Sequence, residues 1–136
     1  MTLQDMLNFE VLFYSPDGKD SPVIDYLGEL NRTNKNAAVK CLEHLKILPL
    51  LVFNNNKAIK TFVHPKHKFY ELKIKGVNRT EFRFFFMRDT PNLIVVYAFR
   101  KNTQKTEKSD INKGIIAIED YKAHKKTAKL FGSQSV

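Results

Sequence analysis

The 136-residue chain is short of the residue types on which several classes of protein depend. Its single cysteine, Cys41, excludes an intramolecular disulfide framework and a cysteine-based metal cluster. The four histidines are too scattered for a zinc site. No apolar run approaches the roughly 20 residues that a membrane helix needs, and the N-terminus lacks the basic region and apolar core of a signal peptide. These absences predict a soluble cytoplasmic protein that uses no metal and no cofactor.

The motifs of nucleotide binding and of several hydrolase families are also missing. The sequence contains no GxxxxGKS or GxxxxGKT phosphate loop, no GxGxxG, no HExxH and no EF-hand loop. It also lacks the nucleophile elbow GxSxG. Any catalytic chemistry must therefore come from Lys, Arg, Glu and Tyr side chains.

Positive charge is what the chain has in excess. Residues 57–108 carry 13 basic and 4 acidic side chains, a net +9, whereas residues 1–56 carry −2 and residues 109–136 carry +2. When clustered Lys and Arg side chains bind the phosphates of a polyanion, they release its counterions, which makes binding favourable. A polyanion partner is therefore the first hypothesis. The alternative is an ordinary basic surface that keeps the protein soluble.

Apolar residues make up 43% of the chain, which is enough for a folded core. The length fits one domain over residues 1–136, with a core from about residue 9 to residue 122 and a flexible tail over residues 123–136.

Local patterns in the first half predict one strand and two helices. The expected elements are a strand over residues 9–14, a helix that starts at Pro22 and, after an interruption at residues 31–34, a helix over about residues 35–48. Asp20 or Ser21 can cap the first helix, and Pro22 suits its first position. Cys41 lies on the apolar stripe of the second helix, which favours a role as a small core residue over a role as a nucleophile.

A period of two takes over from residue 69 and is typical of strands. The expected strands are residues 69–75, 79–87 and 93–99, and the short turns between them favour an antiparallel meander. The last run is almost wholly apolar, so we expect it to be buried on both faces. Ser109 can cap a final helix. The order β-α-α-β-β-β-α predicts a small α+β domain, a twisted antiparallel sheet with two helices packed on one face.

The strands carry side chains suited to cutting RNA. The candidates are Glu71, Lys73, Arg83, Tyr97, Arg100, Lys101 and Lys105. Because a meander brings the ends of its strands together, we expect these groups to line one concave sheet face. There a base would remove the 2′-OH proton, Arg and Lys would neutralise charge on the phosphoryl oxygens, and an acid would protonate the leaving 5′-oxygen. A ring such as that of Tyr97 or Tyr70 would stack on a base.

The same residues also have purely structural interpretations. Glu71 and Arg83 would form an exposed cross-strand ion pair worth well under ~1 kcal/mol. Lys73 and Lys75 would be edge-strand lysines that discourage aggregation. Residues 100–105 would be a solvated loop. The pattern alone favours a solvated charged face over an active site.

Three segments carry a family resemblance. They are YELK at residues 70–73, FRFFF at residues 82–86 and IVVYAFRKNTQKT at residues 94–106. Together they resemble the phage-derived Gp49-like, HigB-type branch of the RelE/ParE toxin superfamily, over about residues 9–122. The element order predicted above is that of the RelE-like fold.

The resemblance implies the toxin of a type II toxin–antitoxin system. Members of this branch are mostly ribosome-dependent, metal-independent endoribonucleases that cut translated mRNA. The implied partners are mRNA on the ribosome and a cognate antitoxin, often with a helix-turn-helix, in a toxin–antitoxin complex, and no membrane. Two alternatives stay open: a ParE-like toxin that poisons DNA gyrase without nuclease activity, and an inactive nucleic-acid-binding member.

The resemblance also assigns residues by position. Arg83 matches the family's phosphate-binding arginine, and Glu71 matches the glutamate of the YEL strand. Lys101 and Lys105 match basic residues of the last motif. The predicted catalytic residues are then Glu71, Lys73, Arg83 and Lys101, and the predicted substrate-binding residues are Lys75, Arg79, Tyr97, Arg100 and Lys105. Replacing Arg83 by alanine is expected to abolish toxicity and leave the fold intact, since an exposed mid-strand arginine adds little stability.

Departures from the family pattern leave the general base open. Tyr97 stands where the family often has a histidine, and Glu107 replaces the usual proline. Lys73 replaces an arginine, which keeps the charge but loses the bidentate fork. The base would then be Glu71 or a lysine whose pKa is lowered by neighbouring cations.

Overall fold

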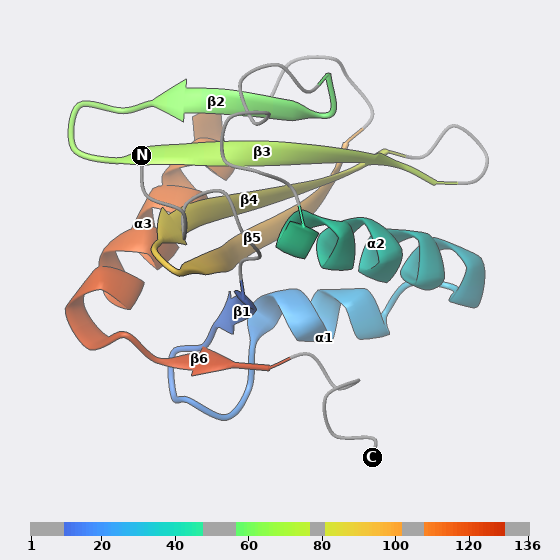
Figure 1. The fold of residues 1–136 in the computed structure, drawn as a ribbon, viewed down its shortest axis with the longest axis horizontal. Helices are drawn as coiled ribbons and strands as arrows, with labels where there is room; N and C mark the ends of the chain where they lie inside the picture. Colours follow the sequence, from blue (N-terminus) through green and yellow to red (C-terminus); the bar gives the residue numbers. More distant parts are fainter. Residues whose placement is uncertain (1–9, 48–56, 77–80, 102–107, 130–136) are drawn as a thin grey trace.

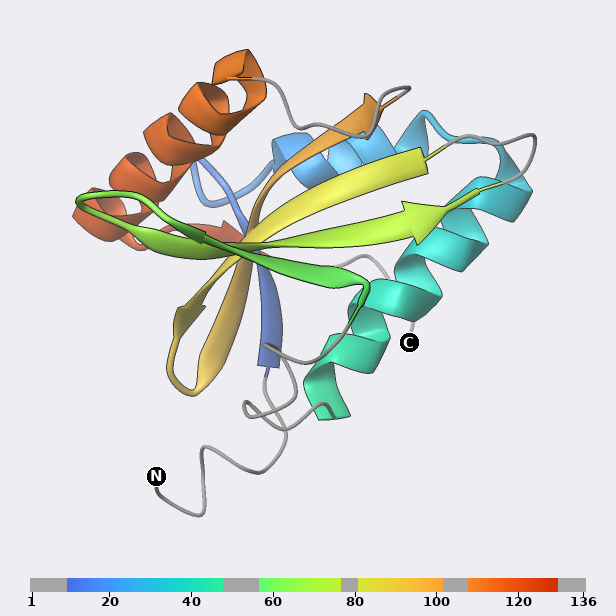
Figure 2. The same cartoon turned by 90° about the horizontal axis from the view of Figure 1, so that it is seen from above.

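A computed structural model describes residues 10–47, 57–76, 81–101 and 108–129 of the chain. Six strands form one sheet in the order β2-β3-β4-β5-β1-β6, with helices on both of its faces (Figures 1 and 2). The elements are β1 (Glu10–Tyr14), α1 (Pro22–Gly28), α2 (Arg32–His44), the 3₁₀ helix η2 (Leu45–Ile47), β2 (Ile59–Val63), β3 (Lys68–Lys75), β4 (Glu81–Asp89), β5 (Asn92–Lys101), α3 (Lys108–His124) and β6 (Thr127–Ala128).

The predicted α+β class is confirmed, and the sheet is mixed rather than wholly antiparallel. Strands β2 to β5 form the expected antiparallel meander. Strand β1 then lies parallel to β5, with Phe13 opposite Val95, and β6 pairs antiparallel with β1. Strands β2 and β6 were not expected, and β6 lies within residues 123–136, the predicted tail.

Capping side chains explain where the first two helices begin. The Oγ of Ser21 accepts a hydrogen bond from the backbone N–H of Ile24 at 3.3 Å, which confirms Ser21 as the cap of α1. Asn31 does the same for α2, because its side-chain oxygen accepts from the N–H of Asn34 at 2.8 Å. The polar run that was expected to interrupt the pattern therefore starts the second helix. The third helix begins at Lys108, so Ser109 lies inside α3 and is not its cap.

The two faces of the sheet bury separate cores. One face packs against α1 and α2 through alternate residues of the meander, such as Leu72, Phe84 and Val95. The other face packs against α3 through a second set that includes Phe69 and Phe85. Figure 2 shows α2 and α3 on opposite sides of the sheet. The expected pair of helices on one face is confirmed, and the final helix covers the opposite face.

Helix α3 is fastened to the sheet by hydrogen bonds between tyrosine and aspartate side chains. The pairs are Tyr97–Asp110 at 3.0 Å, Tyr14–Asp120 at 2.6 Å and Tyr121–Asp89 at 2.8 Å. Each pair joins α3 to a strand, and the tyrosine hydroxyl is the donor in every case. The helix is therefore held at both ends as well as by its apolar face. None of the helices in the described ranges is long and apolar enough to cross a membrane.

Gly114 allows α3 to approach β4 closely. A Cβ atom added at Gly114 would lie 2.5 Å from Cδ2 of the buried Phe85 ring. We expect Gly114→Ala to lower the free energy of unfolding by about 1 kcal/mol, because a steric cost of about 1–3 kcal/mol outweighs the roughly 1 kcal/mol that alanine gains in a helix. Urea unfolding measures the change.

The control for this substitution is Gly28→Ala. A Cβ at Gly28 meets no atom within 4 Å, and the residue is the last of α1. Alanine there is expected to be neutral or to add up to about 1 kcal/mol, since it restricts the unfolded chain. The close contact between α3 and β4 would be refuted if Gly114→Ala were as stable as Gly28→Ala.

Candidate active site

Charged side chains gather on the α3-facing side of the sheet, next to its aromatic core. The register places Lys75, Glu81 and Lys101 in one row across β3, β4 and β5, and Lys73 and Arg83 in the next row. Because directly opposed residues of antiparallel strands share a face, these side chains lie together. We call Glu71, Lys73, Lys75, Glu81, Arg83 and Lys101 the charged cluster.

Arg83 is the centre of this cluster and is bound to two carboxylates. Its Nη1 lies 3.1 Å from Oε1 of Glu71, and its Nη2 lies 2.6 Å from Oε1 of Glu81. The Glu71 and Arg83 side chains are each 1% exposed. The predicted cross-strand ion pair is confirmed, but its position on an exposed face was wrong. The expectation that Arg83→Ala leaves the fold intact therefore loses its premise, because the change would leave a buried carboxylate without its cation.

One nitrogen of Arg83 has no acceptor. Its Nε is buried and lacks a hydrogen-bond partner in the described part of the chain. A buried donor left unpaired costs about 1–3 kcal/mol. The guanidinium therefore retains one unused donor that an anionic oxygen would satisfy.

A bulge in β5 brings Lys101 to this cluster. Phe86 pairs with Val95, but Phe85 pairs with Tyr97, so Val96 is an extra residue in β5. The extra residue reverses which positions of β5 face α3. Lys101 consequently points to the same side as Arg83, whereas in a regular strand it would point to the α1 and α2 side.

Lys101 is a buried cation with few neighbours of opposite charge. Its side chain is at the end of β5 and the residue is 5% exposed. Its Nζ lies 5.9 Å from the centroid of the Phe99 ring. Within the described ranges, no carboxylate lies within 4.0 Å of this ammonium. Buried lysines are rarely left unpaired, so this residue is a strong candidate for function.

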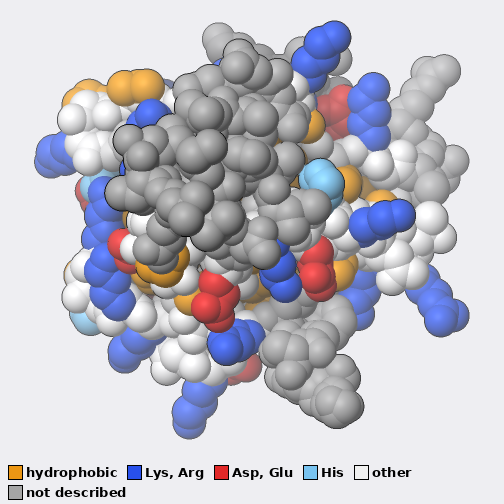
Figure 3. All heavy atoms as spheres, in the orientation of Figure 1, with side chains coloured by type: hydrophobic (Ala, Val, Ile, Leu, Met, Phe, Trp, Pro, Cys, Tyr) orange, Lys and Arg blue, Asp and Glu red, His pale blue; other side chains and the backbone are white. Residues whose placement is uncertain are grey.

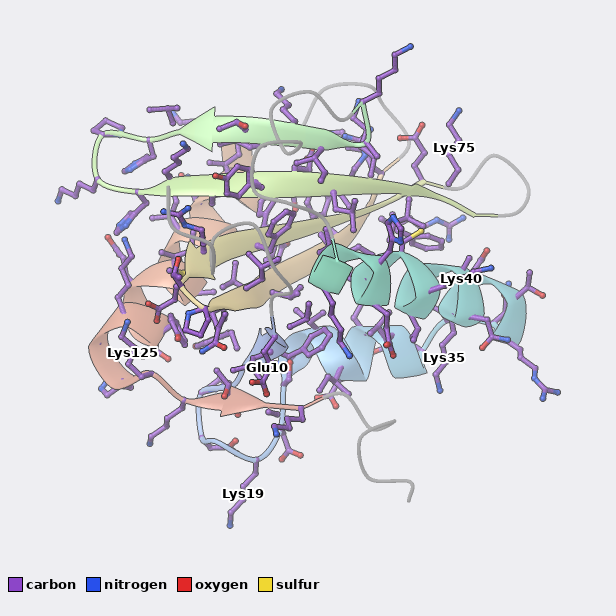
Figure 4. All side chains as sticks on the ribbon, viewed as in Figure 1. Glu10, Lys19, Lys35, Lys40, Lys75 and Lys125 are labelled. Atoms are coloured by element: carbon purple, nitrogen blue, oxygen red, sulfur yellow. The ribbon has the colours of Figure 1, made fainter. Side chains whose placement is uncertain are left out.

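The lysines of β3 lie at different depths. Lys75 is exposed at the end of the strand (Figure 4), and Lys73 is half-buried opposite Arg83. Strand β3 lies between β2 and β4, so it is not the edge strand that was predicted. Its pairs with β2 run from Lys68 to Leu72, and the N–H of Lys73 donates to the carbonyl of Ala58. The sequence pattern did not predict β2.

Both the ring and the hydroxyl of Tyr97 make contacts within the protein. Its ring packs against both Phe85 and Phe99, at centroid distances of 5.8 and 5.5 Å. Its hydroxyl donates to Asp110 of α3. Burial and the hydrogen bond to Asp110 raise the pKa of Tyr97 to about 12, and burial has the larger effect. These contacts favour a role in seating α3 over base stacking.

The remaining candidates lie elsewhere. Arg100 pairs with Phe82 and faces α1, where its charge acts on Tyr26, so the structure does not bring it to the charged cluster. Arg100 and Lys101 both belong to β5, which makes the prediction of a solvated loop wrong for them. Arg79 and Lys105 lie outside the described residues.

Sequence reasoning missed Glu81 as a member of the site. The signal was available, because Glu81 and Arg83 are two apart on a strand and must share a face. The structure adds that Glu81 is 26% exposed, unlike Glu71. Lys and Arg side chains occur at several places around the periphery of the face in Figure 3.

In the part of the chain that the structure describes, the charged cluster does not contain a set of side chains suited to a metal ion. No group of three or more His, Cys, Asp or Glu side chains suited to a metal ion occurs among the residues that the structure describes. The cluster instead offers ammonium and guanidinium groups beside one accessible carboxylate. Such a set can bind a phosphate, stabilise charge on its oxygens and accept a proton.

Comparison with known proteins identifies the family. Residues 25–119 match the model of the phage-derived protein family Gp49-like, DUF891. Neither the curated proteins nor the solved structures gave a significant match. The match covers the charged cluster and most of the sheet. The chain therefore belongs to the phage-derived Gp49-like family, which is a family of HigB-type, RelE-like toxins.

Proposed function

We propose that the protein is a ribosome-dependent endoribonuclease, the toxin of a toxin–antitoxin pair, and that the charged cluster is its active site. The observation that carries the proposal is Lys101, a buried cation without a carboxylate partner among the described residues, beside the paired Arg83. Family membership supports a toxin and implies an antitoxin partner. That partner is expected to carry a helix-turn-helix and to cover the basic segment 57–108.

The proposed reaction is transesterification within the RNA. A base removes the proton of a 2′-hydroxyl, whose oxygen attacks the adjacent phosphorus, and the bond to the 5′-oxygen breaks. Lys101 and Lys73 neutralise the charge that grows on the phosphoryl oxygens. Arg83 holds the carboxylates of the cluster in place. The products are a 2′,3′-cyclic phosphate and a 5′-hydroxyl, and no step requires a metal ion.

The test is to map cuts in one mRNA during reconstituted translation. The protein is first treated with EDTA and then freed of it, and 5′ ends are located by primer extension. We expect cuts within the translated frame, and none in a matched mRNA whose start codon has been removed. The upstream fragments should end in a 2′,3′-cyclic phosphate or the phosphate formed by its hydrolysis.

Intact translated mRNA would refute the proposed function. A DNA gyrase supercoiling assay on the same preparation then examines the gyrase-poisoning alternative. Cuts that also occur in the mRNA without a start codon would refute ribosome dependence while leaving the nuclease activity in place.

A further inference from the structure

The charged cluster contains two carboxylates, and only one of them can meet a substrate. The Glu71 side chain is 1% exposed and its Oε1 is bound to Nη1 of Arg83. The Glu81 side chain is 26% exposed. A general base must come within hydrogen-bond reach of the proton that it takes. Exposure therefore favours Glu81 over Glu71 for that role.

The hydrogen bonds of Glu81 leave one of its oxygens available. Its Oε1 accepts from Nη2 of Arg83 at 2.6 Å, and no contact to Oε2 occurs among the described residues. The bond to Arg83 fixes the carboxylate, because Arg83 is itself fixed by the buried Glu71. A fixed carboxylate with one free oxygen is suited to accept a proton from a bound hydroxyl.

The neighbours of Glu81 are the cations that a phosphate would need. The register places Lys75 of β3 on one side of Glu81 and Lys101 of β5 on the other. The Nε of Arg83, two residues along β4, is a buried donor without an acceptor in the described part of the chain. This unmet donor is a second observation that points to an anionic ligand at the same place.

We propose that Glu81 is the general base of the RNA cleavage, with Lys75 and Lys101 binding the scissile phosphate on either side of it. Oε2 of Glu81 takes the proton of the 2′-hydroxyl as the 2′-oxygen bonds to phosphorus. The bond from phosphorus to the 5′-oxygen breaks, that oxygen keeps the electron pair, and it takes a proton from water. Glu71 is a positioning residue in this scheme, and Arg83 both orients Glu81 and offers its Nε to the phosphate. The inference rests on the proposed endoribonuclease activity.

The test compares Glu81→Gln with the wild type in single-turnover cleavage of mRNA on stalled ribosomes. Glutamine keeps an oxygen for Arg83 but cannot take the proton, so the rate should fall by about 10²–10⁴-fold. Glu81→Asp retains a proton acceptor and should cleave faster than Glu81→Gln. A merely structural role would give the opposite order, because glutamine matches the length of glutamate and aspartate does not.

The matched control is Glu29→Gln, which makes the same change at the exposed end of α1 and should cleave at the wild-type rate. Thermal unfolding of each variant shows that it is folded. A Glu81→Gln rate within threefold of the wild type, or slower cleavage by Glu81→Asp than by Glu81→Gln, would overturn the assignment of Glu81 while the endoribonuclease stands. Absence of cleavage by the wild type would instead overturn the proposed function, and the assignment of Glu81 with it.

Discussion

Replacing Arg83 by methionine is expected to lower the free energy of unfolding by about 3–5 kcal/mol. The change removes the cation that faces Glu71, whose side chain is 1% exposed and cannot turn to solvent. An unpaired charge in such a place costs far more than the lost contact itself. Urea unfolding followed by circular dichroism measures the difference.

Two further variants isolate the cause. Arg88→Met makes the same substitution at an exposed position of the same strand and should change stability by less than about 0.5 kcal/mol. The double variant Glu71→Leu with Arg83→Met removes both charges and should recover most of the loss. If Arg83→Met were as stable as Arg88→Met, the ion pair would not be buried as described. Loss of toxicity in an Arg83 variant would then report folding as much as catalysis.

Lys101→Ala is expected to reduce mRNA cleavage by about 10²–10³-fold, the cost of losing one group that stabilises charge in the transition state. Its effect on stability should be small, because no carboxylate of the described residues depends on its ammonium. The lost contribution is the packing of its aliphatic chain near Phe99. Single-turnover cleavage on stalled ribosomes gives the rate, and urea unfolding gives the stability.

The control for Lys101 is Lys19→Ala. Lys19 projects from the loop after β1, on the opposite side of the view in Figure 4 from Lys75. The Lys19→Ala variant loses the same charge at a distance from the charged cluster, and it should cleave mRNA at the wild-type rate. Equal rates for Lys101→Ala and the wild type would remove Lys101 from the active site.

Local signals made much of the fold predictable. The alternation of apolar and charged residues located β3 and β4, and the Ser21-Pro22 pair located the start of α1. Strand β2 was missed, although Ile59–Val63 is rich in strand-forming residues, because its apolar and polar residues do not alternate. Strand β6 has two residues and depends on β1 for its existence, so no local pattern could indicate it.

The candidate site was predictable in composition but not in arrangement. Strand periodicity puts Glu71 and Lys73 on one face, and the register confirms that Arg83 joins them. The depth of the pair could not be foreseen, because a charged residue between aromatic ones fits an exposed face as well as a buried one. The side on which Lys101 lies depends on the bulge at Val96, and nothing in the run of apolar residues marks that position.

The parallel pairing of β1 with β5 has a consequence for how the protein is made. Phe13 of β1 pairs with Val95 of β5, which lies about 80 residues later in the chain. At a synthesis rate of roughly 5–20 residues per second, β1 waits about 4–16 s for the strand beside it. During that time the core over α1 and α2 lacks the residues that β5 supplies, such as Leu93 and Val95. The charged cluster also needs Lys101, so a nascent chain cannot present the proposed active site before most of it has left the ribosome.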